Sequence, residues 1–399
     1  MRIALHDYAG HPFQVQLSRE LARRDHQVLH LYCSSLRTGK GALAKAPDDP
    51  PSLSFAGISL EEEFERYSPG RRVLQEHQYA ARLLSSLEKF RPELVMSANT
   101  PLFVQRRLLA ACKRSTIPFV FWQQDILGLG TRALARKRLR ILGTVAGEVL
   151  VALERSLLRR SSAVVVISED FVPVLQRWRI PANRIHVIEN WAPLDEIPVL
   201  PRDNEWARER GLVEKSVLLY SGTLGLKHNP SMLLKTAMHF RDDHSVVMAV
   251  ISEGIGAEWL KDSARTHALA NIVILGFQPY ERLPEVFASA DVLLTVLESD
   301  AGVFSVPSKV LSYHCAGRPL LAALPRDNLA RRTIERAGSG VVVDPEDENG
   351  FTNAADELLR RADVRSELGR KARRYAEQTF ALGPITDRFE DVFRLSRPV

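Results

Sequence analysis

Short apolar runs alternate with longer segments of helical periodicity along the whole chain. In the first half, the runs expected to form buried strands are Arg2–Leu5, Val28–Tyr32, Leu94–Ser97, Pro118–Trp122, Ala163–Ser168 and Ile185–Ile188. Helical spacing separates most of them, for example in Leu74–Phe90 and Phe103–Lys113, whereas the polar stretch Ser34–Gly57 predicts a long loop. Because strands that alternate with helices form parallel, doubly wound sheets, this half predicts an α/β fold.

The same alternation starts again after the charged, proline-containing segment Pro193–Gly211. The strands expected beyond it are Ser216–Tyr220, Ser245–Ile251, Asn271–Leu275, Val292–Leu297, Leu320–Leu324 and Gly340–Val343, followed by helices over Leu358–Arg374 and Asp387–Leu395. We therefore expect two Rossmann-like domains that face each other across a cleft. The expected boundaries are residues 1–195, a linker over 196–212, a second domain over 213–375, and terminal helices over 376–399 that pack back toward the first domain. Ligands of such sheets bind outside the carboxyl ends of the strands.

The composition narrows the class of protein. The chain has 399 residues, of which 45% are hydrophobic and 26% charged, as in soluble globular proteins. Its net charge of +6 permits an acidic partner without naming one. The three cysteines, Cys33, Cys112 and Cys315, are far apart, which argues against a disulfide framework or a zinc cluster and fits a reducing cytoplasm. No signal peptide is evident, and no apolar run approaches the roughly 20 residues of a membrane span.

The stretch from Glu298 to Pro319 reads as a loop followed by a short helix. Ser308 is the expected N-cap, and Gly317 falls where a left-handed residue would end the helix. Free N–H groups at the start of such a helix suit an anionic ligand. An ordinary βαβ unit without a ligand has the same pattern, so this stretch alone does not distinguish an anion-binding site from a purely structural unit.

Loops after three strands of the second half carry further candidate residues. In Gly222–Pro230, two glycines, Lys227 and the helix start at Asn229 could hold a diphosphate, although a solvated turn has the same composition and a Walker A motif is missing. Glu253 could accept hydrogen bonds from sugar or ribose hydroxyls, or be a surface turn residue. Phe277 could hold a nucleobase, or pack beneath its loop.

The first half offers fewer chemical groups. Gly10, His11 and Asp125 follow predicted strands, and Asp125 could be an acid/base group or a hydroxyl anchor. A lone carboxylate is more often a helix cap, and a lone histidine is more often structural. The chain contains neither a Gly-x-Ser-x-Gly elbow nor a His-Glu-x-x-His sequence, so the motifs of serine hydrolases and zinc peptidases are missing.

A basic segment precedes an apolar one near the middle of the first half. The basic residues are Arg132, Arg136, Lys137, Arg138 and Arg140. Apolar positions such as Val145 and Val149 follow them. A helix of this kind can lie on an anionic membrane surface, and a solvated helix face is the alternative. The aromatic residues of single-strand nucleic-acid binding are missing from this segment, and no nucleic-acid partner is expected.

Together, the segments Gly222–Pro230, Ser305–Lys309 and Cys315–Pro319 resemble the GT-B glycosyltransferases of family 4, and among these the bacterial exopolysaccharide transferases of the colanic-acid type. The resemblance covers essentially the whole chain and includes Asp125 and Asn190. It implies retaining, metal-independent transfer of a sugar from a nucleotide diphosphate sugar. It places the donor in the second domain and the acceptor in the first, and it implies no cofactor.

The resemblance also assigns roles to residues. The expected diphosphate ligands are Thr223, Lys227, Phe304, Ser305, Val306 and Lys309, and the expected sugar and nucleotide contacts are Glu253, Phe277, Gly302 and Val303. Asp125 falls near the position that faces the reacting sugar and is the expected catalytic residue, with Gly10 and His11 on the acceptor side. The expected enzyme uses a UDP- or GDP-sugar to extend a lipid-linked oligosaccharide for exopolysaccharide or another surface polysaccharide. It would act in the cytoplasm, peripherally on the inner face of the cell membrane.

One departure from the family keeps two alternatives open. Many members carry two glutamates eight residues apart, where this chain has Phe304 and Ser312, and Thr223 stands where many have an arginine. A nucleotide-sugar 2-epimerase of the same fold would need carboxylates in the cleft for proton abstraction, and the sequence offers few. A non-catalytic subunit of a polysaccharide synthase complex is the other alternative.

Overall fold

The computed structural model describes residues 1–36, 40–60, 69–225, 228–301 and 306–396. The side chains of residues 69–71, 130–144 and 301 are also left undescribed. Contacts divide the chain into two compact units, one of Met1–Asn190 together with Leu382–Val399, the other of Trp191–Ala381. Each unit is built on its own parallel sheet, so the predicted α/β class with two doubly wound sheets is confirmed.

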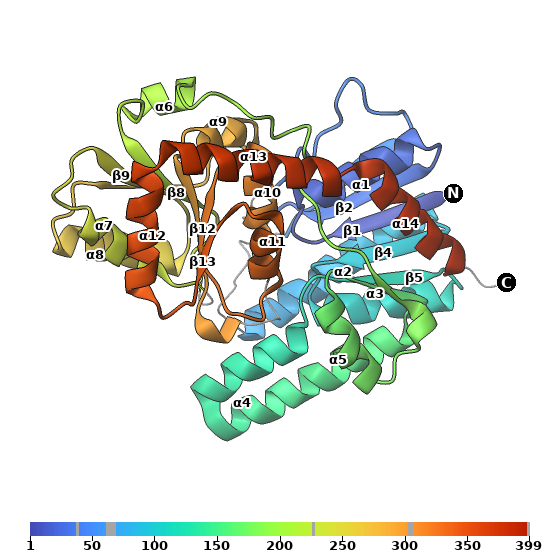
Figure 1. Cartoon of the computed structure of the whole chain (residues 1–399). Coiled ribbons are helices and arrows are strands. Elements are labelled where there is room, and N and C mark those ends of the chain that lie inside the picture. The colour runs from blue at the N-terminus through green and yellow to red at the C-terminus, as the bar shows by residue number, and fades with distance from the viewer. Residues whose placement is uncertain (37–39, 61–68, 226–227, 302–305, 397–399) are drawn as a thin grey trace. The chain divides into compact units, whose positions relative to one another are not determined.

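The first unit has a seven-stranded sheet in the order β3-β2-β1-β4-β5-β6-β7. Its strands are β1 (Arg2–Asp7), β2 (Gln27–Cys33), β3 (Leu53–Ile58), β4 (Leu94–Ala98), β5 (Phe119–Gln123), β6 (Ala163–Val166) and β7 (Ile185–Val187). Every pair is parallel, and Leu5 of β1 lies between His30 and Met96 in the ladder. The central strands are buried almost throughout because helices cover both faces of the sheet (Figure 1), which explains their nearly continuous apolar sequences.

The helices of the first unit come from both ends of the chain. They are α1 (Pro12–Arg23), α2 (Pro69–Phe90), α3 (Leu102–Arg114), α4 (Leu127–Arg160), α5 (Val172–Arg177) and α14 (Leu382–Leu395). Helix α14 packs beside α1, where Arg24 Nη1 lies 2.6 Å from carboxylate oxygens of both Asp387 and Glu390. The Phe389 ring packs on Trp122, with 4.7 Å between the ring centroids. The last helix therefore completes the core of the first unit.

Helix α4 folds back on itself. The Gly128 amide donates to Glu154 Oε2 at 2.8 Å, although the two residues are 26 positions apart. A straight helix would separate them by about 39 Å. Figure 1 accordingly draws α4 as two arms that diverge from a common tip. We call this element the α4 hairpin.

The second unit has a six-stranded sheet in the order β10-β9-β8-β11-β12-β13. Its strands are β8 (Ser216–Ser221), β9 (Val246–Ile251), β10 (Ile272–Leu275), β11 (Val292–Val296), β12 (Leu320–Ala323) and β13 (Gly340–Val343). Its main helices are α7 (Pro230–His239), α8 (Ile255–Thr266), α9 (Leu283–Ala288), α10 (Lys309–Ala316), α11 (Leu329–Ala337), α12 (Glu348–Arg360) and α13 (Ala362–Thr379). Apolar side chains of β8, β9, β11, α7 and α12 form one buried core.

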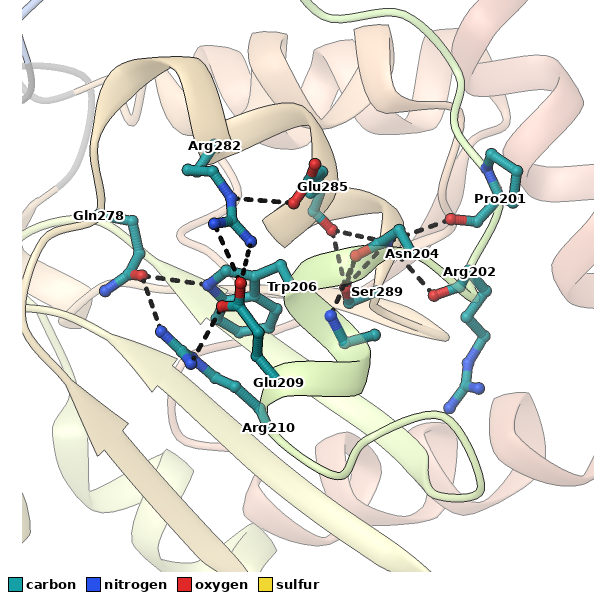
Figure 2. Close-up of polar contacts among 11 residues, drawn as sticks. Pro201, Arg202, Asn204, Trp206, Glu209, Arg210, Gln278, Arg282, Glu285 and Ser289 are labelled. Carbon is teal, nitrogen blue, oxygen red and sulfur yellow. Dashed lines mark hydrogen bonds and ion pairs between the residues drawn. The ribbon is translucent and has the colours of Figure 1, made fainter.

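Residues 196–212, expected as a linker, lie within the second unit and contain helix α6 (Glu205–Glu209). Figure 2 shows how this short helix is held. The Asn204 side chain accepts from the Ala207 amide at 3.0 Å and donates to the Glu285 carbonyl at 3.1 Å. Buried Trp206 donates through Nε1 to Gln278 Oε1 at 3.1 Å. Polar contacts on both sides therefore fix this segment to α9 and to the loop after β10.

Two expectations about single elements were wrong. The stretch Ser34–Gly57, expected as a loop, contains most of β3. Because β3 is an edge strand, its middle is only partly buried and lacks a strong apolar signal. The expected helix Leu358–Arg374 is divided between α12 and α13. The Arg365 guanidinium donates to the Leu358 carbonyl at 2.6 Å and so satisfies the last turn of α12.

Candidate active site

At the end of β8, two tyrosines fix the backbone that leads into the glycine loop. The buried Tyr313 hydroxyl accepts from the Ser221 amide at 2.9 Å and donates to the Ser221 carbonyl at 3.1 Å. The Tyr220 hydroxyl donates to the Thr223 carbonyl at 3.0 Å. Burial raises the pKa of both phenols, so they stay neutral hydrogen-bonding groups. The backbone at Ser221–Thr223 is therefore held in one conformation.

Lys309 places a positive charge directly beside this loop. Its Nζ lies 3.5 Å from the centroid of the Tyr220 ring, which attracts a cation through its π face. Gly222 has φ 128°, and a Cβ there would lie 2.9 Å from Lys309 Cε and 3.0 Å from Nζ. Only glycine suits both the backbone conformation and this close approach. The absence of a side chain at Gly222 thus lets the Lys309 ammonium group lie directly against a turn of the main chain.

Lys309 is also the first residue of α10. Ser308 occupies the N-cap position as predicted, but its side chain makes no capping hydrogen bond. Gly317 ends the helix in the left-handed conformation with φ 65°, which confirms the predicted C-terminus. The helix N-terminus and the Lys309 ammonium therefore lie on the side of the glycine loop, where both favour negative charge.

Loops after three neighbouring strands meet at this edge of the sheet. The Leu224 amide after β8 donates to Ser252 Oγ after β9 at 3.0 Å. The Phe277 amide after β10 donates to Glu253 Oε1 at 3.2 Å. Thr223 and Glu253 are exposed. The structure therefore brings Thr223, Glu253 and Phe277 into one row at the carboxyl ends of β8, β9 and β10. Lys309 follows β11, which lies on the other side of β8 in the sheet.

Several expected donor-site residues lie outside the described part of the chain. These are Lys227, Gly302, Val303, Phe304 and Ser305. Val306 is described and half-buried, just ahead of α10. In the loop Gly222–Pro230, Asn229 caps α7 by accepting from the Met232 amide at 3.2 Å, which confirms the helix start predicted there. Buried His228 accepts the Gly225 amide through Nδ1 at 3.0 Å and so shapes the glycine loop.

In the first unit, Asp7 at the end of β1 organises the loop that carries Gly10 and His11. Its buried carboxylate accepts from the amides of Ala9, at 3.1 Å, and of His11, and from Asn99 Nδ2 at 3.2 Å. Burial raises the pKa of Asp7, and these hydrogen bonds oppose that rise. Gly10 has φ 77°, and the His11 ring packs on Phe13. The loop conformation therefore depends on a carboxylate that sequence reasoning missed.

A pocket of about 460 Å³ opens beside Asp125. Its wall combines aromatic and amide side chains with the carboxylate, namely Tyr8, Phe121, Trp122, Asn99, Gln105, Gln124 and Asp125. Asp125 is half-buried, and its neighbour Gln124 exchanges two hydrogen bonds with Asn190, at 3.2 and 2.6 Å. Gly10 and His11 do not line this pocket in the part of the chain that the structure describes. The pocket lies at the carboxyl ends of β1, β4 and β5.

Glu154 supports the segment that carries Asp125. Its buried carboxyl accepts from Gln123 Nε2 and the Leu127 amide, each at 3.1 Å, and from the Gly128 amide at 2.8 Å. Burial raises its pKa from 4.5 to about 7, and the three hydrogen bonds oppose this rise. Sequence reasoning also missed Glu154. In the sequence, Glu154 stands out only as an acidic residue at a position where the helical pattern otherwise has apolar residues.

The basic side chains predicted for a membrane surface, Arg132, Arg136, Lys137, Arg138 and Arg140, lie outside the described side chains. The second arm of the α4 hairpin is described from residue 145 onward. Val145 and Val149 are 59% and 60% exposed, on the side of this arm opposite buried Val151 and Glu154. Nowhere in the described chain is a helix both long and apolar enough to span a membrane.

Comparison with known families decides the assignment. The model "Glycosyl transferase 4-like domain" matches residues 11–191, and "Glycosyl transferases group 1" matches residues 203–375. The chain belongs to the family 4 glycosyltransferases of the GT-B fold. It is thus a retaining glycosyltransferase that uses a nucleotide sugar, in a metal-independent family, and the predicted resemblance is confirmed. The described residues contain no group of three or more His, Cys, Asp or Glu side chains arranged to hold a metal ion.

The relatives of this glycosyltransferase include enzymes of polysaccharide synthesis. The colanic acid biosynthesis glycosyl transferase WcaI of Escherichia coli is 24% identical over 305 residues, which cover 74% of this chain and 72% of WcaI. Spore coat protein SA of Bacillus subtilis is 23% identical, covering 81% of this chain and 84% of its own. Among solved structures, Anabaena HepE in complex with UDP has a TM-score of 0.69 at 15% identity, covering 99% of this chain and 100% of HepE. This last likeness shows the fold alone.

Proposed function

We propose that this glycosyltransferase extends a lipid-linked oligosaccharide with the sugar of a UDP- or GDP-sugar during synthesis of a surface polysaccharide. The observation that carries the donor half of this proposal is the Lys309 ammonium, held beside Gly222 at the carboxyl end of β8. Negative charge grows on the leaving diphosphate during transfer. A cation fixed before the reaction stabilises that charge without further reorganisation.

The donor would lie along the row formed by Lys309, Thr223, Glu253 and Phe277. In our proposal, Lys309, Thr223 and Val306, together with Lys227, Phe304 and Ser305, hold the diphosphate. Glu253, Phe277, Gly302 and Val303 then face the sugar and the nucleoside. Structures of HepE with UDP and with UDP-glucose support uridine as the first base to test.

The acceptor would bind in the pocket beside Asp125. Aromatic faces of Tyr8 and Trp122 with amides of Asn99 and Gln124 match the alternating apolar and hydroxyl surfaces of a sugar ring, and about 460 Å³ falls within the usual range of ligand pockets. In this proposal, Asp125 is the carboxylate that faces the reacting sugar. Gly10 and His11 would shape the acceptor side from the loop after β1.

A lipid carrier is supported by the α4 hairpin and by the relatives. Val145 and Val149 present apolar surface to solvent on an arm that also carries exposed Arg155 and Arg159. Exposed apolar side chains with flanking cations are typical of surfaces that rest on anionic membranes. WcaI is named for colanic acid synthesis, and the structural neighbour WaaG for lipopolysaccharide synthesis. The proposed location is the cytoplasmic face of the cell membrane.

Replacement of Lys309 tests the proposed function. Purified protein is incubated with a panel of UDP- and GDP-sugars and lipid-linked acceptors extracted from membranes, and release of the nucleoside diphosphate is measured. We expect Lys309→Gln to lower kcat by about 100-fold or more, as for other preorganised groups that stabilise developing charge. Lys235→Gln is the matched control, because Lys235 is 49% exposed on α7 and pairs with Glu348.

Two results would count against this function. Equal turnover by wild type and Lys309→Gln would show that Lys309 does not stabilise the charge that develops on the leaving diphosphate. Conversion of a UDP-sugar to its 2-epimer in the absence of acceptor would assign the chain to epimerase chemistry instead.

A further inference from the structure

An arginine-rich pocket of about 560 Å³ lies in the second unit, at the edge of the sheet opposite the glycine loop. Asp291 and the segment Gly317–Pro319 form part of its wall, and they immediately precede β11 and β12. Gly222 and Thr223 instead follow the carboxyl end of β8, in the same parallel sheet. The pocket is therefore separate from the proposed donor site.

Positive charge exceeds negative charge among the residues that line this pocket. The lining arginines are Arg318, Arg365, Arg370, Arg373 and Arg374, against the acids Asp291 and Glu377. Glu377 pairs with Arg373 at 2.8 Å. Asp291 pairs with Arg202 of the neighbouring segment at 3.0 Å and lies 3.7 Å from Arg365. Within the described residues, Arg318, Arg370 and Arg374 have no acidic side chain in ion-pair contact.

Arg318 has a hydrogen-bond donor for which the described residues of the pocket offer no acceptor. Its Nη2 donates to the Leu200 carbonyl at 3.1 Å. Its Nε is buried and has no hydrogen-bond acceptor among the residues that the structure describes. Burial lowers the pKa of Arg318, and the charge of Asp291 only partly opposes this effect. A partly buried guanidinium with a buried, unused Nε donor costs free energy, which an anion brought near it would offset.

Close backbone contacts hold the wall of the pocket together. Gly369 of α13 packs against Gly317 so closely that a Cβ on Gly369 would lie 2.4 Å from the Gly317 carbonyl oxygen. Arg373 Nη1 donates to the carbonyls of Ile197, at 3.0 Å, and Cys315, at 2.8 Å. These contacts join the segment around Ile197, the end of α10 and helix α13. The arginines consequently project from fixed backbone rather than from a loose surface.

We propose that this pocket binds a small phosphorylated ligand through a group with at least two negative charges, such as a diphosphate. Planar guanidinium groups match phosphate oxygens with paired hydrogen bonds, and several of them converge here. The ligand would contact Val199 and helix α13, which both belong to the second unit.

Titration with inorganic pyrophosphate tests this site. Binding is measured by isothermal calorimetry at low salt for the wild type, for Arg370→Gln combined with Arg374→Gln, and for Lys371→Gln. The two arginines are exposed and line the pocket. Lys371 is exposed on the same helix and pairs with Glu367. We expect the double variant to lose tenfold or more in affinity for one class of sites, and Lys371→Gln to stay within twofold of wild type.

Identical isotherms for wild type and the double variant would overturn the proposal. Arg318→Gln provides a second, independent variant, and it should weaken the same class of sites. A flotation assay at pH 8 with vesicles that contain phosphatidic acid, a phosphomonoester lipid that can carry two negative charges, separates the two sources of phosphate. Reduced flotation of the double variant would assign the phosphate to a lipid headgroup, whereas unchanged flotation with lost pyrophosphate binding would assign it to a free ligand.

Discussion

At the scale of single residues, Glu154 links protonation to the conformation of the proposed acceptor side. Its carboxyl receives three hydrogen bonds from the segment around Asp125, yet burial raises its pKa from 4.5 to about 7. Between pH 4.5 and about pH 7, Glu154 therefore stays protonated in a larger fraction of folded molecules than of unfolded chains. The free energy of unfolding therefore falls as pH rises from about 4.5 to about 7, and this contribution is constant above that range.

Replacement of Glu154 by glutamine should remove this pH dependence. A shift from 4.5 to about 7 corresponds to a change of at most about 3 kcal/mol. We expect the stability advantage of wild type over Glu154→Gln to shrink by up to that amount between pH 5 and pH 8. Urea unfolding at both pH values measures it, with Glu148→Gln on the exposed side of the same arm as control. Parallel pH profiles for wild type and Glu154→Gln would contradict the role of this carboxyl.

Residues of the candidate site could be predicted where a local motif carries them. Glycines, a lysine and a helix start follow one another within Gly222–Pro230 and Ser305–Lys309, so Thr223 and Lys309 were found from short segments. Asp7 and Glu154 were not found, because their partners lie elsewhere in the sequence. Glu154 bonds to an amide 26 positions away, and only the fold-back of α4 brings the two together.

At the scale of elements, the α4 hairpin presents two valines to solvent where a helix in water would carry polar residues. Val145 and Val149 stand one turn apart on the same side of the second arm. Buried Val151 and Glu154 occupy the opposite side. The outward apolar side is therefore not required for packing within the first unit.

Polar replacement of these valines should weaken membrane binding. We expect Val145→Gln combined with Val149→Gln to lower affinity for anionic vesicles by about tenfold or more, because each buried valine contributes about 1 kcal/mol or more. Replacement of the basic residues within 132–140 by glutamine should have a similar effect. Flotation measures both, and Leu395→Gln, at a 71% exposed site on α14, is the control. Flotation equal to that of wild type would exclude the hairpin as the binding surface.

Sequence periodicity located most elements but not all of their ends. Buried strands were found because their apolar runs are nearly continuous. Strand β3 was missed because it lies at the sheet edge, where burial is incomplete. The break between α12 and α13 was missed because the Arg365 side chain, rather than a glycine or proline, satisfies the last turn of α12.

At the scale of the whole molecule, the last helix belongs to the unit that the first residues begin. Periodicity can show that Leu382–Leu395 is helical, and the terminal helices were expected to pack toward the first domain, but the sequence does not show which surface such a helix covers. That information lies in contacts such as the one between Phe389 and Trp122, which are far apart in sequence. Phe389 is fully buried there.

Truncation of Phe389 should destabilise the first unit. We expect Phe389→Ala to lower its free energy of unfolding by about 3–5 kcal/mol, the usual cost of removing a buried aromatic side chain. Urea unfolding followed by tryptophan fluorescence measures the change. Leu395→Ala on the same helix is the control, because Leu395 is largely exposed. Equal unfolding midpoints for the two variants would show that α14 contributes little to the core of the first unit.

The return of the chain to the first unit has a consequence for its synthesis. The surface around Trp122 is translated early, but α14, which covers it, is translated only after residues 191–381. At about 5–20 residues per second, a ribosome needs about 10–40 s to make that segment. During this interval the nascent first unit exposes apolar side chains that the finished protein buries. The first half of the nascent chain is thus a natural client for chaperones that bind emerging polypeptides, until its last helix arrives.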